Sequence, residues 1–307
     1  MPGSFEIQHV PVAWYHPAMA RYKLTIAYDG TAFHGWQKQN RPDGSSLRTV
    51  QAVVEETVSH VIGQPVILTG ASRTDTGVHA IGQVAAFTAQ TPIPIERLAR
   101  AVTARLPDDV QVRRAEIVRD DFDPIRDCIA KGYRYHFAHG ITGEDDGTGR
   151  LRPLFDRNYV FWTYHDLDVD RMNEAARHLI GEHDFASFAK VNHGRESTVR
   201  TIYDCAVTAS GAHRCHIDVS GNGFLYHMVR IIAGTLMEIG RGAVEPDAMP
   251  SIIAAADRRA AGPTLPPTGL CLRWIRYGDD GAQVPGTDAG EDNAGRTPPT
   301  DASVNPT

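Results

Sequence analysis

Apolar and polar positions alternate with two different periods along the chain, which predicts a protein built of both strands and helices. Residues 22–28 alternate and end at Asp29-Gly30, as is typical of a strand that runs into a turn. Residues 47–62 place apolar side chains at helical spacing after Ser46, a candidate N-cap. The two patterns recur and predict further strands at 66–68, 84–87, 110–118, 131–137, 201–209, 213–219 and 269–275, and further helices at 94–104, 170–181 and within 223–240.

A stretch rich in Gly, Asp and Thr near the middle of the chain predicts two parts. At 307 residues the chain is long enough for two modest domains. We expect, in chain order, a flexible N-terminal arm (1–20), an N-terminal α+β half (21–139), a mobile loop (140–152), a C-terminal α+β half (153–277) and a disordered acidic tail (278–307).

Composition narrows the class of protein. The apolar content of 42% is ordinary for a globular protein, and no run approaches the 18 apolar residues expected of a membrane span. The N-terminus lacks a charged region followed by an apolar core, so no signal peptide is expected. Four scattered cysteines without a Cys-x-x-Cys motif favour thiols in a reducing compartment. We therefore expect a cytoplasmic protein with no membrane partner.

One short cluster, His213-Arg214-Cys215-His216, contains residue types that bind metals. Neighbouring side chains on a strand point to opposite faces, so these ligands could not converge on one ion. We expect no metal site.

The net charge of −6 is concentrated at the C-terminal end of the chain. From residue 278 onward there are six acidic residues and one arginine, which leaves the rest of the chain close to neutral. A chain that is nearly neutral outside its C-terminal end can still carry a basic groove, because phosphates are attracted by the local electrostatic field and not by the total charge. The charge therefore does not exclude a nucleic-acid substrate.

The chemically richest stretch is the polar loop between the predicted strands at 66–68 and 84–87. It reads Thr-Gly-Ala-Ser-Arg-Thr-Asp-Thr-Gly-Val-His-Ala over residues 69–80 and carries Arg73, Asp75 and His79. A carboxylate such as Asp75 suits a nucleophile or a base near neutral pH. Taken alone, an Asp-x-Gly loop is most often only a turn whose aspartate binds backbone donors.

The triplet Asp75-Thr76-Gly77 also matches the signature of aspartic proteases, in which two aspartates share a proton. The chain has one such triplet, so this interpretation would require a dimer. The polar Arg73 and Thr74 stand where those proteases usually have apolar residues.

The whole motif decides among these interpretations. Gly70-x-x-Arg73-Thr74-Asp75-x-Gly77-Val78-His79-Ala80, followed by Gly82-Gln83-Val84, closely resembles the active-site block of the TruA family of tRNA pseudouridine synthases. Further blocks share the resemblance: Tyr28-Asp29-Gly30 with Phe33-His34-Gly35-Trp36-Gln37-x-Gln39, His183-Asp184-Phe185-x-Ser187-Phe188, and Met228-Val229-Arg230. Together they span residues 22–277.

The resemblance implies an α+β fold of two similar halves, each an antiparallel sheet with helices on one face, that meet at a central RNA-binding cleft. It implies an isomerase that converts uridine to pseudouridine in the tRNA anticodon stem-loop, at positions 38–40, without a cofactor. It further implies a homodimer that binds tRNA across both subunits.

The resemblance also implies roles for four residues. Asp75 is expected to be the catalytic nucleophile, attacking the ribose C1′ or the uracil ring, or instead the base that removes a proton from the sugar. Arg230 is expected to pair with Asp75, because a lone charge among apolar neighbours is costly. Arg73 is expected to take the place vacated by the target base or to hold a phosphate.

The fourth residue is Tyr133, on the predicted strand at 131–137. Alternation places Tyr133, Tyr135 and Phe137 on one face, which fits either a hydrophobic core or a surface for stacking a base. The family resemblance implies that Tyr133 packs on the target uridine and assists proton removal at C5. Arg126 is displaced by one position from the family pattern, so no role is expected for it.

Two other functional classes remain as alternatives at this point. A non-catalytic tRNA-binding module would have no need of Asp75 or Arg230. A dimeric aspartic protease would cleave peptides and leave uridine unchanged.

Overall fold

The structure, a computed structural model, describes residues 18–39, 44–140, 152–190 and 196–278. The predicted N-terminal arm, the loop between the halves and the acidic tail lie almost wholly outside these residues.

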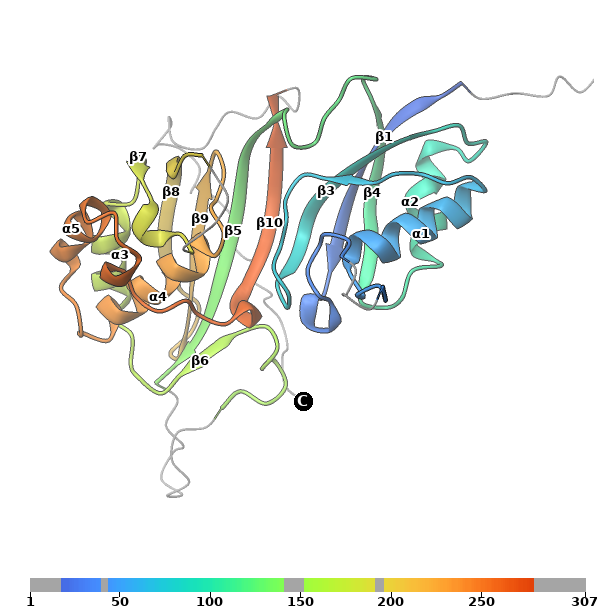
Figure 1. Cartoon of the computed structure of the whole chain (residues 1–307). Coiled ribbons are helices and arrows are strands. Elements are labelled where there is room, and N and C mark those ends of the chain that lie inside the picture. The colour runs from blue at the N-terminus through green and yellow to red at the C-terminus, as the bar shows by residue number, and fades with distance from the viewer. Residues whose placement is uncertain (1–17, 40–43, 141–151, 191–195, 279–307) are drawn as a thin grey trace, which may run out of the picture.

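Within the described residues the chain forms one large mixed sheet and five α-helices (Figure 1). The strands are β1 (Ala20–Tyr28), β2 (Thr69–Gly70), β3 (His79–Ala89), β4 (Val110–Val118), β5 (Cys128–His139), β6 (Phe161–Thr163), β7 (Gly181–Asp184), β8 (Val199–Ala209), β9 (Arg214–Gly221) and β10 (Leu270–Tyr277). The helices are α1 (Val50–Ile62), α2 (Ile95–Thr103), α3 (Val169–Arg177), α4 (Met228–Gly240) and α5 (Met249–Ala254).

The strand order β4-β1-β3-β10-β5-β9-β8-β7 joins two antiparallel parts into a single sheet. The junction is the parallel pair β3–β10, in which Cys271 lies opposite His79 and Leu272 opposite Ala80. Helices α1 and α2 lie over one end of the sheet and α3, α4 and α5 over the other (Figure 1). The predicted α+β class with two halves is therefore confirmed. The last strand of the described chain, β10, lies at the centre of the sheet, and it joins the part that carries the loop of Asp75 to the part that carries α4.

Most predicted elements are present, and the differences have local physical causes. Helix α1 begins later than the predicted cap at Ser46 because Thr49 takes that position and accepts a hydrogen bond from the amide of Ala52. Its buried stripe of Val50, Val54 and Val58 confirms the helical spacing. Helix α3, by contrast, begins earlier than predicted, because Asp168 and not Asp170 is its N-cap, and it ends at Arg177.

The predicted strand at 66–68 is wrong, because side chains of α1 occupy the backbone groups that a neighbouring strand would use. Ser59 Oγ accepts from the amide of Val66 at 3.1 Å, and Glu55 Oε2 accepts from the amide of Leu68 at 2.8 Å. Only Thr69–Gly70 of this segment pairs in the sheet, with β3. The backbone amides of this segment are therefore hydrogen-bonded to side chains of the helix and not to a neighbouring strand.

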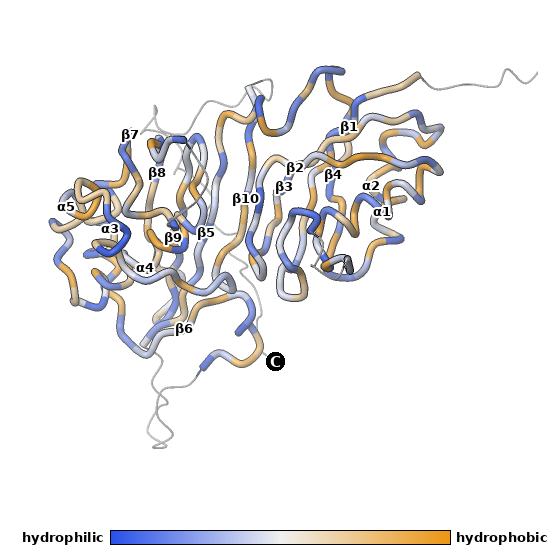
Figure 2. The backbone as a smooth tube through the Cα atoms, viewed as in Figure 1, coloured by the Kyte–Doolittle hydropathy of each residue, from blue (hydrophilic) through white to orange (hydrophobic). Residues whose placement is uncertain are grey.

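Buried apolar residues of the strands and helices form one hydrophobic cluster. Figure 2 shows apolar positions along the strands and helices at both ends of the sheet. Helix α4 is the most deeply placed, since almost all its residues are buried. A helix that is apolar around most of its surface belongs in a core, and Arg230 is the charged exception near its start.

The opposite face of the central strands carries polar side chains. Arg134 of β5 forms a two-bonded ion pair with Asp218 of β9, and the rings of His136 and His216 lie 5.9 Å apart. Burial lowers the pKa of His136 to about 4, with the neighbouring His216, Arg134 and Arg273 adding to the effect and Asp218 opposing it. This face therefore disfavours protonated histidine.

The lowered pKa of His136 predicts a stability that depends on pH. Between its ordinary value of 6.5 and about 4 the unfolded chain binds a proton that the folded chain does not, so the free energy of unfolding falls as the pH falls through that window. Urea unfolding at pH 7 and at pH 5 should show a smaller loss for His136→Gln than for the unmodified chain. An equal loss in both proteins would contradict this account.

Candidate active site

The polar loop between β2 and β3 is held in place by groups on three other segments. The hydroxyls of Tyr28 and Thr74 hydrogen-bond at 2.7 Å, and the amide of Trp36 donates to the carbonyl of Thr74 at 3.1 Å. Gln83 closes the loop from β3: its Nε2 donates to the carbonyl of Ser72 at 2.6 Å, and its Oε1 accepts from the Ser72 amide at 3.2 Å. The loop is thus preorganised on a rigid frame.

Two glycines of the sequence motifs allow this close packing. Gly35 has a φ of +83°, and a Cβ there would lie 2.7 Å from the carbonyl oxygen of Thr74. A Cβ on Gly70 would lie 2.2 Å from the indole nitrogen of Trp36. Any larger residue would displace the loop or the buried tryptophan.

The loop presents Asp75 to an arginine from the other side of the molecule. Arg230 Nη1 donates to Asp75 Oδ2 at 3.1 Å, although 155 residues separate the two in the chain. The side chains of Asp75 and Arg230 are only 22% and 13% exposed, so the pair is largely shielded from water. Arg230 Nε also donates to the carbonyl of Leu265 at 2.7 Å, which fixes the guanidinium plane. The structure brings these two predicted site residues together.

His227 is a third member of this group that the sequence analysis did not identify. Its Nε2 lies 3.5 Å from Asp75 Oδ2, and its side chain is mostly buried. Burial lowers the pKa of His227, while the charge of Asp75 acts in the opposite direction. The three-residue spacing between His227 and Arg230 at the start of a helix could have indicated a shared face.

Arg230 and His227 approach the same carboxylate oxygen of Asp75. Oδ2 has both contacts, whereas Oδ1 has no hydrogen bond to any residue that the structure describes. The carboxylate is therefore oriented by one oxygen and has the other available for chemistry.

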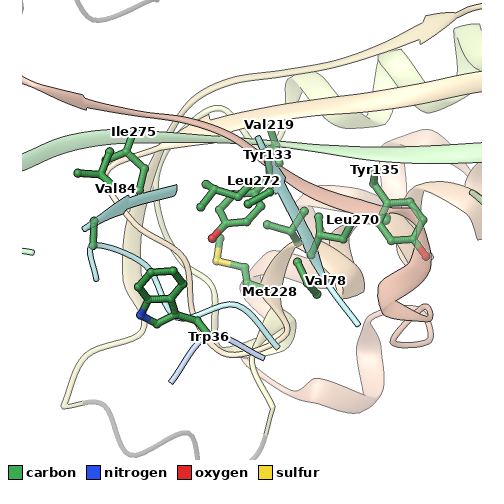
Figure 3. Close-up of a cluster of buried hydrophobic side chains, with 14 of the residues drawn as sticks. Trp36, Val78, Val84, Tyr133, Tyr135, Val219, Met228, Leu270, Leu272 and Ile275 are labelled. Carbon is green, nitrogen blue, oxygen red and sulfur yellow. The ribbon is translucent and has the colours of Figure 1, made fainter. Parts of the chain in front are cut away.

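Tyr133 lies beside the loop, in the cluster of buried side chains that includes Met228 and Leu272 (Figure 3). Its hydroxyl hydrogen-bonds to that of Ser72 at 2.9 Å, and Phe224 packs edge-on against its ring with centroids 5.2 Å apart. Burial raises the pKa of Tyr133 to about 12, and the negative charge of Asp75 contributes to the increase. Tyr133 is therefore a neutral phenol near pH 7, with a phenolate fraction of about one in 10⁵.

Arg73 does not join the Asp75 cluster. Its side chain is exposed, and no ion pair or hydrogen bond connects it to another residue of the described chain.

His79, at the end of the loop, faces a different region. The amide of Gly30 donates to its Nδ1 at 3.1 Å, so the ring proton lies on Nε2, which donates to the carbonyl of Asn158 at 2.8 Å. A cavity of about 620 Å³ lies beside it, lined by Asp29, Tyr159 and Arg214 among others and not by Asp75. His79 anchors the loop, and this cavity is separate from the Asp75 cluster.

Neither a group of metal ligands nor a membrane-spanning helix occurs in the described residues. No group of three or more His, Cys, Asp or Glu side chains there could hold a metal ion. None of the helices in those residues combines the length and apolarity needed to cross a bilayer. His216 of the weak metal-like cluster lies 3.5 Å from Asp218 instead.

Comparison with known proteins shows the family to which the chain belongs. The chain matches the protein-family model described as tRNA pseudouridine synthase over residues 24–125 and 175–278. The chain belongs to the tRNA pseudouridine synthase family. The match includes the loop with Asp75 and the helix with Arg230, so the predicted resemblance is confirmed.

Individual members of the family are similar over most of the chain. The chain is 41% identical over 260 residues to tRNA pseudouridine synthase A of Geotalea uraniireducens (strain Rf4) and 40% identical over 260 residues to that of Geotalea daltonii (strain DSM 22248 / JCM 15807 / FRC-32). It is 39% identical over 259 residues to tRNA pseudouridine synthase A 2 of Clostridium perfringens (strain 13 / Type A). Each alignment covers 84% of this chain and 100% of the relative.

Membership of the tRNA pseudouridine synthase family confirms the predicted class, an isomerase that forms pseudouridine in tRNA. The match to the tRNA pseudouridine synthase family rules against the aspartic-protease alternative. Within the described chain, the ionisable side chains that contact Asp75 are those of Arg230 and His227.

The shielded pair predicts a measurable coupling between its two members. In a double-mutant cycle of urea unfolding with Asp75→Asn and Arg230→Met, we expect a coupling of about 1 kcal/mol or more, because each single change leaves its partner without a counter-charge. The pair Arg259–Asp257 is a matched control and should couple more weakly, since the Arg259 side chain is 90% exposed. Additive effects of the Asp75 and Arg230 substitutions would contradict the pairing.

Proposed function

We propose that this enzyme isomerises uridine in the anticodon stem-loop of tRNA, at positions 38–40, with Asp75 as the nucleophile. The observation that carries the proposal is the geometry of Asp75: Arg230 holds Oδ2 at 3.1 Å and Oδ1 has no hydrogen-bond partner among the described residues. A nucleophile needs this combination of fixed orientation and a free lone pair.

The reaction is an internal rearrangement and needs no external group. The bond between C1′ and N1 breaks, the uracil turns, and C1′ joins C5. The proton that leaves C5 is balanced by the proton that N1 gains, so atoms and electrons are conserved without a redox step. As the nucleophile on C1′, Asp75 forms an Oδ1–C1′ bond while the electron pair of the C1′–N1 bond leaves with the uracil. The Oδ1–C1′ bond then breaks when C5 joins C1′, and Arg230 keeps the carboxylate oriented in both steps.

Tyr133 and Arg73 act on the substrate in this proposal. The target base must leave its stack to be reached, at a cost of a few kcal/mol. Tyr133, with its ring fixed by Phe224 and its hydroxyl by Ser72, packs on the displaced uracil. Its pKa of about 12 suits it as a hydrogen-bond donor and makes it a poor base near pH 7. Arg73, exposed and unpaired among the described residues, fills the vacated space or binds a phosphate.

The proposal extends to the setting of the enzyme. We place it in the cytoplasm, which is supported by four cysteines that are free thiols. We also propose a homodimer that binds tRNA across both subunits, as the family resemblance implies. The division into halves at residues 21–139 and 153–277 belongs to the same proposal.

Replacement of Asp75 tests the proposed nucleophile. Asp75→Asn keeps the size of the side chain and removes its charge, so turnover should be lost while tRNA binding remains largely intact. Release of tritium from tRNA that contains 5-³H-uridine reports isomerisation directly, because only reaction at C5 frees that label. Appreciable tritium release by Asp75→Asn would defeat the assignment.

Removal of the Tyr133 hydroxyl tests how the ring is held. Tyr133→Phe loses the bond to Ser72 and should lower the rate by about 100-fold or more, because small displacements of a positioned group are costly in catalysis. The fold should remain, as judged by an unchanged urea midpoint within the error of the measurement. A near-normal rate would show that stacking alone is required.

A further inference from the structure

An exposed aromatic ring lies one residue away from the Asp75 cluster. The Tyr226 side chain is 45% exposed, although its neighbours Leu225 and Met228 are buried. Its ring lies against that of His227, with centroids 4.0 Å apart, and His227 in turn lies 3.5 Å from Asp75 Oδ2. One imidazole therefore separates an accessible aromatic surface from the carboxylate.

The backbone is strained at the residue that creates this arrangement. His227 has a φ of +66°, a left-handed conformation that is unfavourable for residues other than glycine. It precedes α4 without making a side-chain cap. The unusual turn lets His227 reach inward to Asp75 while Tyr226 stays at the surface beside it, and the two consecutive rings lie against each other at an angle of 36°. Strain of this kind persists where the surrounding structure enforces it, and it is frequent at functional sites.

A lysine from a second segment completes the surface. The Lys190 Nζ lies 5.1 Å from the centre of the Tyr226 ring, and the Lys190 amide donates to the Tyr226 carbonyl at 3.1 Å. The Lys190 side chain is exposed. An exposed cation–π contact is weaker than the stacking of a nucleobase on an aromatic ring, so a base can displace the flexible ammonium from the ring.

The charged groups that act most on His227 include three cations and one carboxylate. Burial is the main cause of the lowered pKa of His227, and the charges of Arg230, Lys190 and Arg258 lower it further while Asp75 opposes them. Three cations against one carboxylate attract a phosphate backbone even though the whole chain is acidic.

We propose that Tyr226 and Lys190 form a binding site for the nucleotide next to the target uridine, whose base stacks on Tyr226 and whose phosphate binds Lys190. This inference rests on the proposed function, because it needs a uridine at Asp75. It adds a second aromatic contact that holds the neighbour in place when the target base leaves the stack.

The test uses tRNA transcripts with 5-³H-uridine and compares an intact RNA with one that has an abasic residue beside the target. On intact RNA, Tyr226→Ala should lower kcat/KM about 10-fold or more, mainly through KM, and Tyr226→Phe should recover most of the loss because it keeps the ring. The abasic RNA should lower kcat/KM for the unmodified enzyme, with little further loss in Tyr226→Ala. The two changes remove the same contact.

Tyr164→Ala is a matched control. Tyr164 is 51% exposed and its ring lies 4.1 Å from that of His165, so it copies the local arrangement outside the site. Its replacement should leave kcat/KM unchanged. The logarithm of the tRNA binding constant falls linearly with the logarithm of the salt concentration. Lys190→Gln should make this slope less steep by about one, as expected for the loss of one phosphate contact.

The outcomes separate this inference from the proposed function. If the unmodified enzyme releases no tritium from intact tRNA, both fall. If the unmodified enzyme does release tritium, two results would overturn the inference alone. One is a normal kcat/KM for Tyr226→Ala, and the other is an equal reduction of kcat/KM by Tyr226→Ala on intact and on abasic RNA.

Discussion

The contact between Asp75 and Arg230 is the interaction on which the arrangement of the proposed active centre depends. Each partner is also held by contacts of its own. The loop of Asp75 is hydrogen-bonded to Tyr28 and Gln83, and Arg230 lies in a buried helix and donates to the Leu265 carbonyl. A partly buried charge without a partner is costly, so the two sides of the molecule are stabilised in the one arrangement that pairs them. The β3–β10 junction makes that arrangement possible, because it carries the chain from the α4 side back beside the end of the loop.

The contacts of Asp75 differ between its two carboxylate oxygens. Arg230 and His227 both approach Oδ2, so the restraint acts on one oxygen and the other stays available. Tyr133 occupies the same core but is kept neutral by its burial, which assigns it to packing and hydrogen bonding.

Sequence reasoning predicted the contact between Asp75 and Arg230 better than the architecture around it. An arginine among the apolar residues of α4 needs a partner, and the family resemblance indicated Asp75. The predicted strand at 66–68 was wrong because the backbone amides there donate to the side chains of Glu55 and Ser59 and not to a neighbouring strand. The spacing of apolar residues carries no information on such side-chain acceptors. Helix starts were misplaced by one to a few residues because several adjacent residues could each act as a cap.

Other features depend on long-range packing and could not be read from the chain. The parallel pairing of β3 with β10 joins residues almost 200 positions apart, and local patterns carry no information on such partners. The left-handed backbone of His227 has no signature in residue type, so its contact with Asp75 was missed. The exposure of Arg73, by contrast, agrees with the polar character of its loop, although its role remains a proposal.

The central claim is that Asp75 acts through Oδ1 while Arg230 holds Oδ2. The most direct measurement is a crystal structure of the enzyme with an anticodon stem-loop that carries 5-fluorouridine at the target position, where loss of the C5 substituent as a proton is blocked. The account predicts the target nucleotide in contact with Asp75 Oδ1 and Arg230 still paired with Oδ2. A nucleotide bound away from Asp75, or an Arg230 that has left the carboxylate, would contradict it.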